Sequence, residues 1–212
     1  HFLFSEWKHL MIILFFAILI LIPQFIYWNK VTGHYLFFSY TNNERFFWTE
    51  PMIWKGLFGF RKGLFIYTPL ILFAFTGFFF LKKKAKEWTF AIPVVSVVAI
   101  YIILSWWSWW YGGGFGLRPF VDYYGLLSLP LAAFIASIPE FKRPVKFTAS
   151  ILLSISIFLG IYNYIKYYYG TIHFDSMTWK AYKNYFFKIH DDKDFKSFLE
   201  HPDYQKAKLE RE

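Results

Sequence analysis

Five long apolar stretches in the first 166 residues constrain this chain more than any other feature. An α-helix rises about 1.5 Å per residue, so roughly 19 apolar residues cross the ~30 Å hydrocarbon layer of a bilayer. Lipid offers no partner for backbone amides, and helices satisfy these groups internally. The sequence therefore predicts an all-α, polytopic membrane protein with about five transmembrane helices. The predicted spans are Leu10–Trp28, Leu64–Leu81, Trp88–Tyr111, Val121–Ile138 and Phe147–Ile165.

The connectors between these stretches differ in charge, and this difference predicts the orientation. Two short connectors, Lys82–Lys86 and Phe141–Lys146, are dense in lysine and arginine, as expected of cytoplasmic loops. The segments Asn29–Gly63 and Gly112–Phe120 then lie on the outer side, together with the tail after Lys166. Aromatic residues that close the first and third spans form an interfacial belt on that side.

Composition changes near Tyr169 and Gly170, which predicts two parts. Residues 1–168 would form the transmembrane bundle, with outer loops 29–63 and 112–120, and residues 169–212 an extracytoplasmic tail. The net charge of +9 belongs to the bundle, because the tail holds eight basic and eight acidic residues. We interpret this surplus as topology plus attraction to anionic headgroups. Membrane lipid is therefore an expected partner, and nucleic acid is not.

The tail is expected to form three short helices, over Trp179–Ile189, Asp192–Glu200 and Pro202–Glu212. Asp191 or Asp192 would cap the second. Such helices most often pack on the outer surface of a bundle, and a role in substrate binding is the alternative.

Several kinds of chemistry are excluded or disfavoured by what the chain lacks. Cysteine is absent, so disulfides, thiolate catalysis and cysteine metal sites are excluded. The central parts of the five stretches hold no Asp, Glu, Lys, Arg or His. Because such residues mark ion paths and proton relays, the sequence argues against a channel or a proton-coupled pump.

The outer loop 29–63 is unusually aromatic, with ten aromatic residues between His34 and Phe60. Within it, Pro51–Phe58 predicts a short amphipathic helix in the plane of the interface. This helix would form either one wall of a groove for a lipid-linked substrate or a packing element that seals the bundle. Arg61 and Lys62 follow; they would either anchor a helix end among lipid phosphates or bind a specific phosphate.

The densest group of candidate residues is Trp106–Tyr124, which holds four glycines in five positions. Arg118 and Asp122 lie four residues apart at the start of the fourth helix, where they could form an ion pair. In one interpretation this pair only caps the helix. In the other, Arg118 binds a phosphate bidentately and Asp122 orients it, while Trp110, Tyr111 and the neighbouring tryptophans stack on a sugar or isoprenoid.

These motifs resemble the C-terminal half of polytopic membrane glycosyltransferases of the GT-C superfamily from Bacteroidetes-type bacteria. The resemblance rests on five segments across nearly the whole chain. They are Val31–Phe37, Gly56–Gly63 with Tyr67–Pro69, Trp110–Gly116, Arg118 with Asp122, and Pro202–Tyr204.

The resemblance implies inverting transfer of a sugar from a polyprenyl-phosphate-linked donor at the outer face of the bacterial inner membrane, with a divalent metal in some members. It extends a substrate-binding role to Arg118 and Asp122 and, more loosely, to His34, Arg61 and Lys62.

The superfamily's catalytic acidic residue lies in a first outer loop that this chain lacks, so we expect an N-terminal portion of the same protein, or partner subunits, to supply it. The alternatives are a non-enzymatic scaffold or accessory subunit that anchors an extracytoplasmic complex, and a flippase for lipid-linked glycans, which the uncharged spans disfavour.

Overall fold

The computed structural model describes residues 7–37 and 44–210, and within them the chain is all-helical, with isolated bridges but no extended strand. The chain forms two compact units, His1–Glu44 and Arg45–Glu212. Four helical segments in the described residues are long and apolar enough to cross a membrane, which identifies a helical membrane protein. They are Trp7–Thr32, Lys86–Ser105, Arg118–Glu140 and Arg143–Tyr168.

The first unit is the single helix α2 (Trp7–Thr32), which contains the predicted span Leu10–Trp28. Its 26 residues include Pro23, and none of them is buried. A helix of this length and apolarity can cross the hydrocarbon layer.

The second predicted span is broken into two helices, α4 (Leu64–Tyr67) and α5 (Ile71–Lys84). Pro69 explains the break, since proline has no N–H and disfavours helical dihedrals in the preceding residue. Thr68 accordingly has φ −132° and ψ 65°. Helix α5 has 14 residues and is about 21 Å long. It is not among the four segments of the described residues that are long and apolar enough to cross a membrane, whereas the sequence predicted about five.

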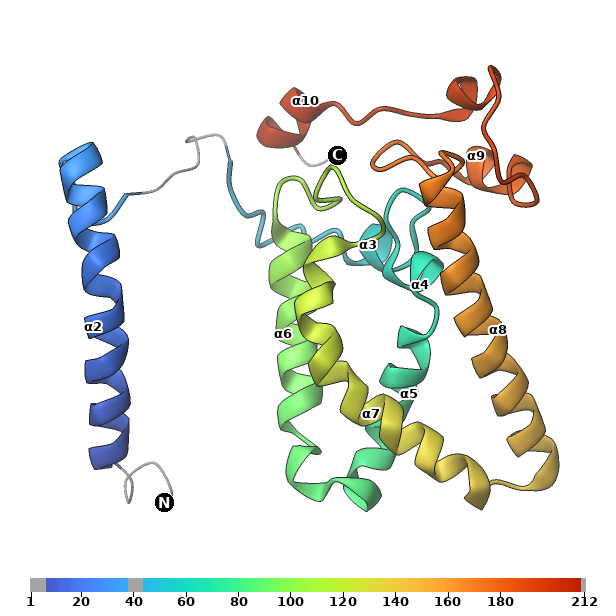
Figure 1. Cartoon of the computed structure of the whole chain (residues 1–212), viewed down its shortest axis with the longest axis horizontal. Helices are drawn as coiled ribbons and strands as arrows, with labels where there is room; N and C mark the ends of the chain where they lie inside the picture. Colours follow the sequence, from blue (N-terminus) through green and yellow to red (C-terminus); the bar gives the residue numbers. More distant parts are fainter. Residues whose placement is uncertain (1–6, 38–43, 211–212) are drawn as a thin grey trace. The chain divides into compact units, whose positions relative to one another are not determined.

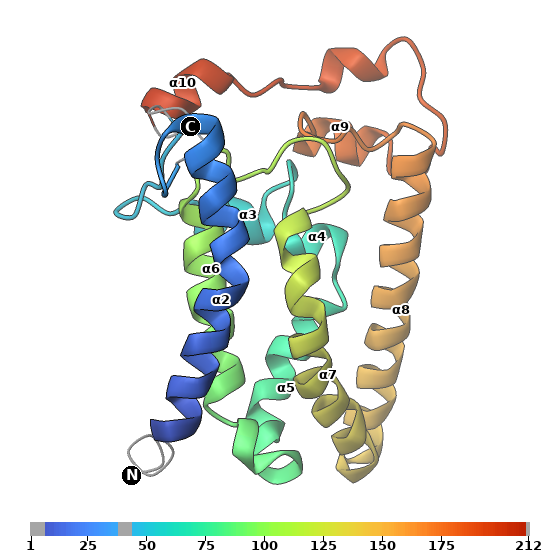
Figure 2. The same ribbon diagram turned by 60° about the vertical axis from the view of Figure 1, so that its left-hand side comes forward.

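Helices α5, α6 (Ala91–Ser105), α7 (Tyr124–Ser137) and α8 (Arg143–Tyr168) run between the two ends of the second unit (Figures 1 and 2). One end holds both basic connectors, and Glu140 joins them by accepting hydrogen bonds from Lys83 and Lys84, each at 2.7 Å. The other end holds α3, the glycine-rich segment and the tail. The unit also contains the short helices α3 (Ile53–Phe58), η1 (Lys86–Trp88), η2 (Arg118–Tyr123) and η3 (Ile138–Glu140).

Helices α5 and α7 approach each other closely at Gly77. A Cβ atom added at Gly77 would lie 1.9 Å from the carbonyl oxygen of Pro130 in α7. Small residues let membrane helices pack backbone to backbone in this way.

The tail starts where α8 ends. Gly170 has φ +90°, the left-handed conformation that commonly terminates a helix, so the end of α8 at Tyr168 coincides with the predicted composition boundary. The tail helices are α9 (Trp179–Asn184), η4 (Phe195–Phe198) and α10 (Tyr204–Leu209). They are shorter than predicted, with Thr178 and Asp203 as side-chain caps of α9 and α10.

The tail packs on the helices of the second unit, at the end opposite the basic connectors (Figure 1). Lys166, in the last turn of α8, is fully buried and donates to the carbonyl oxygens of Tyr185 (2.7 Å) and Phe186 (3.2 Å). The Tyr182 hydroxyl donates to Asn163 Oδ1 (3.1 Å), and Asn163 Nδ2 donates to the Ile66 carbonyl (3.0 Å). These bonds hold α9 against α8 and α4.

Candidate functional site

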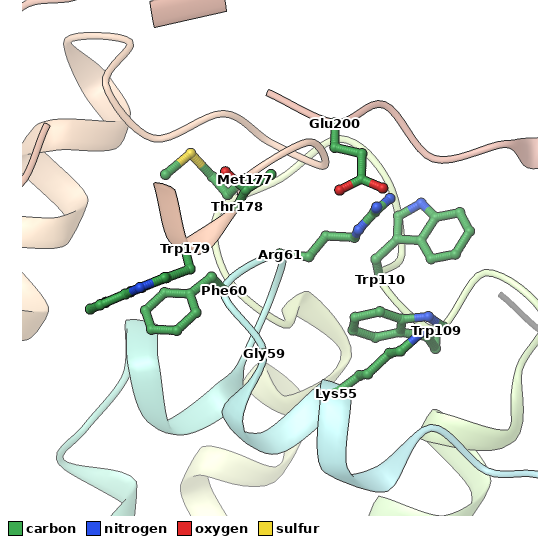
Figure 3. A pocket seen from close by; sticks show the side chains of 10 residues that line it. All are labelled: Lys55, Gly59, Phe60, Arg61, Trp109, Trp110, Met177, Thr178, Trp179 and Glu200. Atoms are coloured by element: carbon green, nitrogen blue, oxygen red, sulfur yellow. The ribbon is translucent and has the colours of Figure 1, made fainter. Parts of the chain in front are cut away.

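A pocket of about 370 Å³ opens at the tail end of the second unit (Figure 3). It lies between the loop after α3, the tryptophan segment after α6 and the start of the tail. We call it the arginine pocket. It is lined by Lys55, Gly59, Phe60, Arg61, Trp109, Trp110, Met177, Thr178, Trp179 and Glu200.

Arg61 supplies the most distinctive electrostatic feature of this pocket. Its guanidinium lies 5.5 Å from the ring centre of Trp110 and extends between that ring and the carboxylate of Glu200 (Figure 3). Nη1 of Arg61 is buried without a hydrogen-bond partner. An unsatisfied buried donor costs roughly 1–3 kcal/mol, and more when it is charged, so an anionic acceptor bound here would stabilise the site.

Trp109 and Trp110 form one wall of the pocket, and they lie in a turn that follows α6. The predicted span continued to Tyr111, whereas the helix ends at Ser105 and the chain then turns. Tyr111 (φ 51°) and Gly112 (φ 48°) are both left-handed, an uncommon conformation for tyrosine that costs about 1–3 kcal/mol. The Tyr111 hydroxyl donates back to the Ile103 carbonyl (2.9 Å), which stabilises the turn and leaves Trp109 and Trp110 on the pocket wall.

Lys62 is adjacent to Arg61 in sequence but has a different environment. Its side chain is 1% exposed, and its Nζ donates to the carbonyl oxygen of Gly114. Burial lowers the pKa of Lys62 to about 8, with Asp175 raising it and Arg118 lowering it. Lys62 therefore fixes the glycine-rich segment and does not line the arginine pocket.

Arg118 and Asp122 are exposed and do not line this pocket. The possible ion pair between them is absent from the described residues, because residues 118–123 form a 3₁₀ helix. With three residues per turn, positions i and i+3 share a face and positions i and i+4 do not. Pro119 does lie in the first turn, as predicted.

His34 lies in the first unit, just after α2, and is exposed. The arginine pocket is built from the second unit alone. Of the seven predicted substrate-binding residues, Arg61 and Trp110 line it, Lys62 and Tyr111 support its walls, and Arg118, Asp122 and His34 are elsewhere.

The tail contributes polar residues that sequence reasoning missed. Asp175 is 4% exposed and accepts hydrogen bonds from Ser176 Oγ (2.6 Å) and the Tyr204 hydroxyl (2.7 Å). His173 Nδ1 lies 3.2 Å from Asp175 Oδ1. Trp110 Nε1 donates to the Tyr204 hydroxyl (3.4 Å), so this cluster is connected to the pocket wall. Tyr204 belongs to the Pro202–Tyr204 segment of the resemblance, whereas the sequence signal for Asp175 and His173 was the mixed polar and aromatic composition of the tail.

No set of three or more His, Cys, Asp or Glu side chains in the described ranges could hold a metal ion. The divalent metal implied by the resemblance stays a prediction for the complete protein.

Comparisons with known proteins add no relative, since no family model, no curated protein and no solved structure matches the chain.

Proposed function

We propose that this chain is part of an integral membrane glycosyltransferase that moves a sugar from a polyprenyl-phosphate donor at the outer face of a bacterial inner membrane. In this proposal the arginine pocket binds the phosphate and sugar of the donor. The basic connectors would face the cytoplasm, and the pocket and tail would face outward.

The observation that carries the proposal is the partnerless guanidinium nitrogen of Arg61 in a tryptophan-walled pocket. Sugar transfer from a lipid phosphate breaks the bond between the anomeric carbon and a phosphate oxygen, and negative charge develops on that oxygen. A preorganised guanidinium stabilises such charge and can contact two phosphate oxygens at once. Tryptophan rings suit the apolar faces of a sugar or an isoprenoid.

Donor binding by Arg61 variants tests this function. In the complete protein in lipid nanodiscs, we expect Arg61→Gln to weaken binding of undecaprenyl phosphate about 10- to 100-fold, the loss expected for one charge-assisted contact. Arg61→Lys should fall between, because lysine keeps the charge and loses the planar fork.

Two controls separate phosphate recognition from general lipid affinity. Arg143→Gln, at the basic end, should leave binding unchanged, and undecaprenol, which lacks the phosphate, should bind the unchanged protein and Arg61→Gln equally. Equal undecaprenyl phosphate binding by Arg61→Gln and the unchanged protein would favour the scaffold alternative.

A further inference from the structure

Asp175 is a buried carboxylate with an unusually complete set of partners. Ser176 and Tyr204 donate to it, and His173 Nδ1 lies 3.2 Å away. Burial alone would raise the pKa of Asp175, but the hydrogen bonds from Ser176 and Tyr204 lower it below 3.8 overall, helped by the two nearby histidines. Asp175 is therefore a fixed negative charge at neutral pH.

His173 contacts Asp175 and also lies on the wall of a second cavity. It lines a pocket of about 450 Å³, here called the tyrosine pocket, whose wall also includes Tyr164, Tyr167 and Tyr168. His173 Nδ1 lies 3.2 Å from Asp175 Oδ1 and 3.4 Å from the backbone nitrogen of the same residue, which is the longer and weaker contact. The closer carboxylate favours a proton on Nδ1, which leaves Nε2 as the unprotonated base. The same arrangement orients the histidine of hydrolytic triads.

A chain of contacts connects this histidine to Arg61. The guanidinium lies over Trp110 (5.5 Å), Trp110 Nε1 donates to the Tyr204 hydroxyl (3.4 Å), and that hydroxyl donates to Asp175 (2.7 Å), which faces His173. The cation of one pocket and the imidazole of the other thus belong to one packed network.

We infer that the tyrosine pocket binds a hydroxyl-bearing acceptor, that His173 is its general base, and that Asp175 is the residue that positions His173. This inference rests on the proposed glycosyltransferase function and places the base within this chain, whereas the resemblance placed an acidic group upstream.

The proposed step is a direct displacement at the anomeric carbon of the donor sugar. The acceptor O–H gives its proton to His173 Nε2, and the acceptor oxygen forms a bond to the anomeric carbon of the donor sugar. The bond from that carbon to the phosphate oxygen breaks, and the leaving polyprenyl phosphate keeps the electron pair. Asp175 stabilises the imidazolium that forms.

A purely structural role for the cluster explains less. Ser176, Tyr204 and Asp175 are sufficient to join the two halves of the tail, and His201 Nδ1 adds a bond to Ser176 Oγ (2.8 Å). None of these bonds requires an imidazole on the wall of a cavity. His190, an exposed histidine of the tail outside this cluster, lines neither pocket and gives a matched control.

The test measures sugar transfer by the complete protein from radiolabelled undecaprenyl-phosphate mannose, with membranes of a strain lacking the gene as the acceptor source. His173→Gln should lower kcat about 10²- to 10⁴-fold, the usual contribution of a general base, and leave undecaprenyl phosphate binding within twofold. His190→Gln should keep at least a third of the rate.

The pH profile of the unchanged protein gives a second readout, which does not depend on whether a variant folds. Burial lowers the pKa of His173 below 6.5, Asp175 raises it, and His201 and Lys62 lower it. The kcat of the unchanged protein should therefore fall with pH below 6.5, and Asp175→Asn should move this acidic limb to lower pH.

The outcomes separate the inference from the proposed function. Full activity in His173→Gln, or a kcat that does not fall at any pH below 6.5 at which the protein stays folded, would overturn the general base and leave the transferase proposal standing. Absence of any transfer by the unchanged protein would overturn both.

Discussion

Arg61 and Lys62 show how two adjacent residues of the same charge acquire different roles. In the sequence they form one basic pair, for which two shared roles are expected: anchoring a helix end among lipid phosphates or binding a specific phosphate. In the structure Arg61 reaches the arginine pocket, whereas Lys62 is buried beneath the glycine-rich segment and donates to Gly114. Because Lys62 is buried and hydrogen-bonded to Gly114, only Arg61 of the pair lines the pocket.

The desolvation of Lys62 makes a measurable difference to stability. Its pKa is about 8 in the folded protein and close to 10.5 when unfolded, so the unfolded chain binds more protons between these values. Stability should therefore rise between pH 8 and 10.5, relative to Lys62→Met, by on the order of 3 kcal/mol. Unfolding free energies in detergent at both pH values measure this difference. Exposed Lys86→Met is the control, and parallel pH curves for Lys62→Met and the unchanged protein would contradict the account.

At the scale of elements, the contact between α5 and α7 depends on a missing side chain. A Cβ atom at Gly77 would clash with the backbone of Pro130 in α7, which cannot move without displacing the helix. Helix α5 is thus held to α7 by a close backbone approach.

We expect Gly77→Ala to destabilise the protein by about 1–3 kcal/mol, the usual range for overpacking. Gly160→Ala in α8 is the matched control, because nothing lies within 4 Å of a Cβ atom there. Alanine is also the better helix former by up to about 1 kcal/mol, so Gly160→Ala should leave stability unchanged or slightly raised. The thermal unfolding midpoints of the two variants in detergent measure this difference. Equal midpoints would contradict a close backbone contact at Gly77.

The sequence predicted the long helices well because their signal is local. Length and apolarity suffice for Trp7–Thr32 or Arg143–Tyr168, and Pro69 could have revealed the break between α4 and α5. The end of α6 at Ser105 was missed, because the tryptophans that follow are as apolar as the helix itself.

The candidate site was only half predictable for the opposite reason. Arg61 lies in a basic pair and Trp110 in a tryptophan-rich segment, so both could be chosen as candidate site residues from the sequence. Asp175, His173 and Tyr204 are connected to the pocket only by contacts between residues far apart in sequence. The contact between Trp110 and Tyr204, for example, joins residues 94 positions apart. The 3₁₀ start of η2, which separates Arg118 from Asp122, likewise follows from packing.

At the scale of the whole molecule, the second unit has a basic end and a pocket-bearing end. In the proposed orientation, the positive-inside rule places the basic end in the cytoplasm. The pocket would then meet a lipid-linked donor at the outer interface, where the isoprenoid can stay in the membrane while the phosphate reaches Arg61.

Cysteine accessibility tests orientation and ligand together, and the cysteine-free chain suits it. Lys55→Cys places a thiol on the arginine pocket, and Lys86→Cys places one at the basic end. In right-side-out spheroplasts, an impermeant maleimide should label Lys55→Cys, more slowly when undecaprenyl phosphate is added, and should label Lys86→Cys only after permeabilisation. Labelling of Lys86→Cys but not of Lys55→Cys in sealed spheroplasts, or labelling of Lys55→Cys at a rate indifferent to undecaprenyl phosphate, would contradict an outward-facing phosphate site.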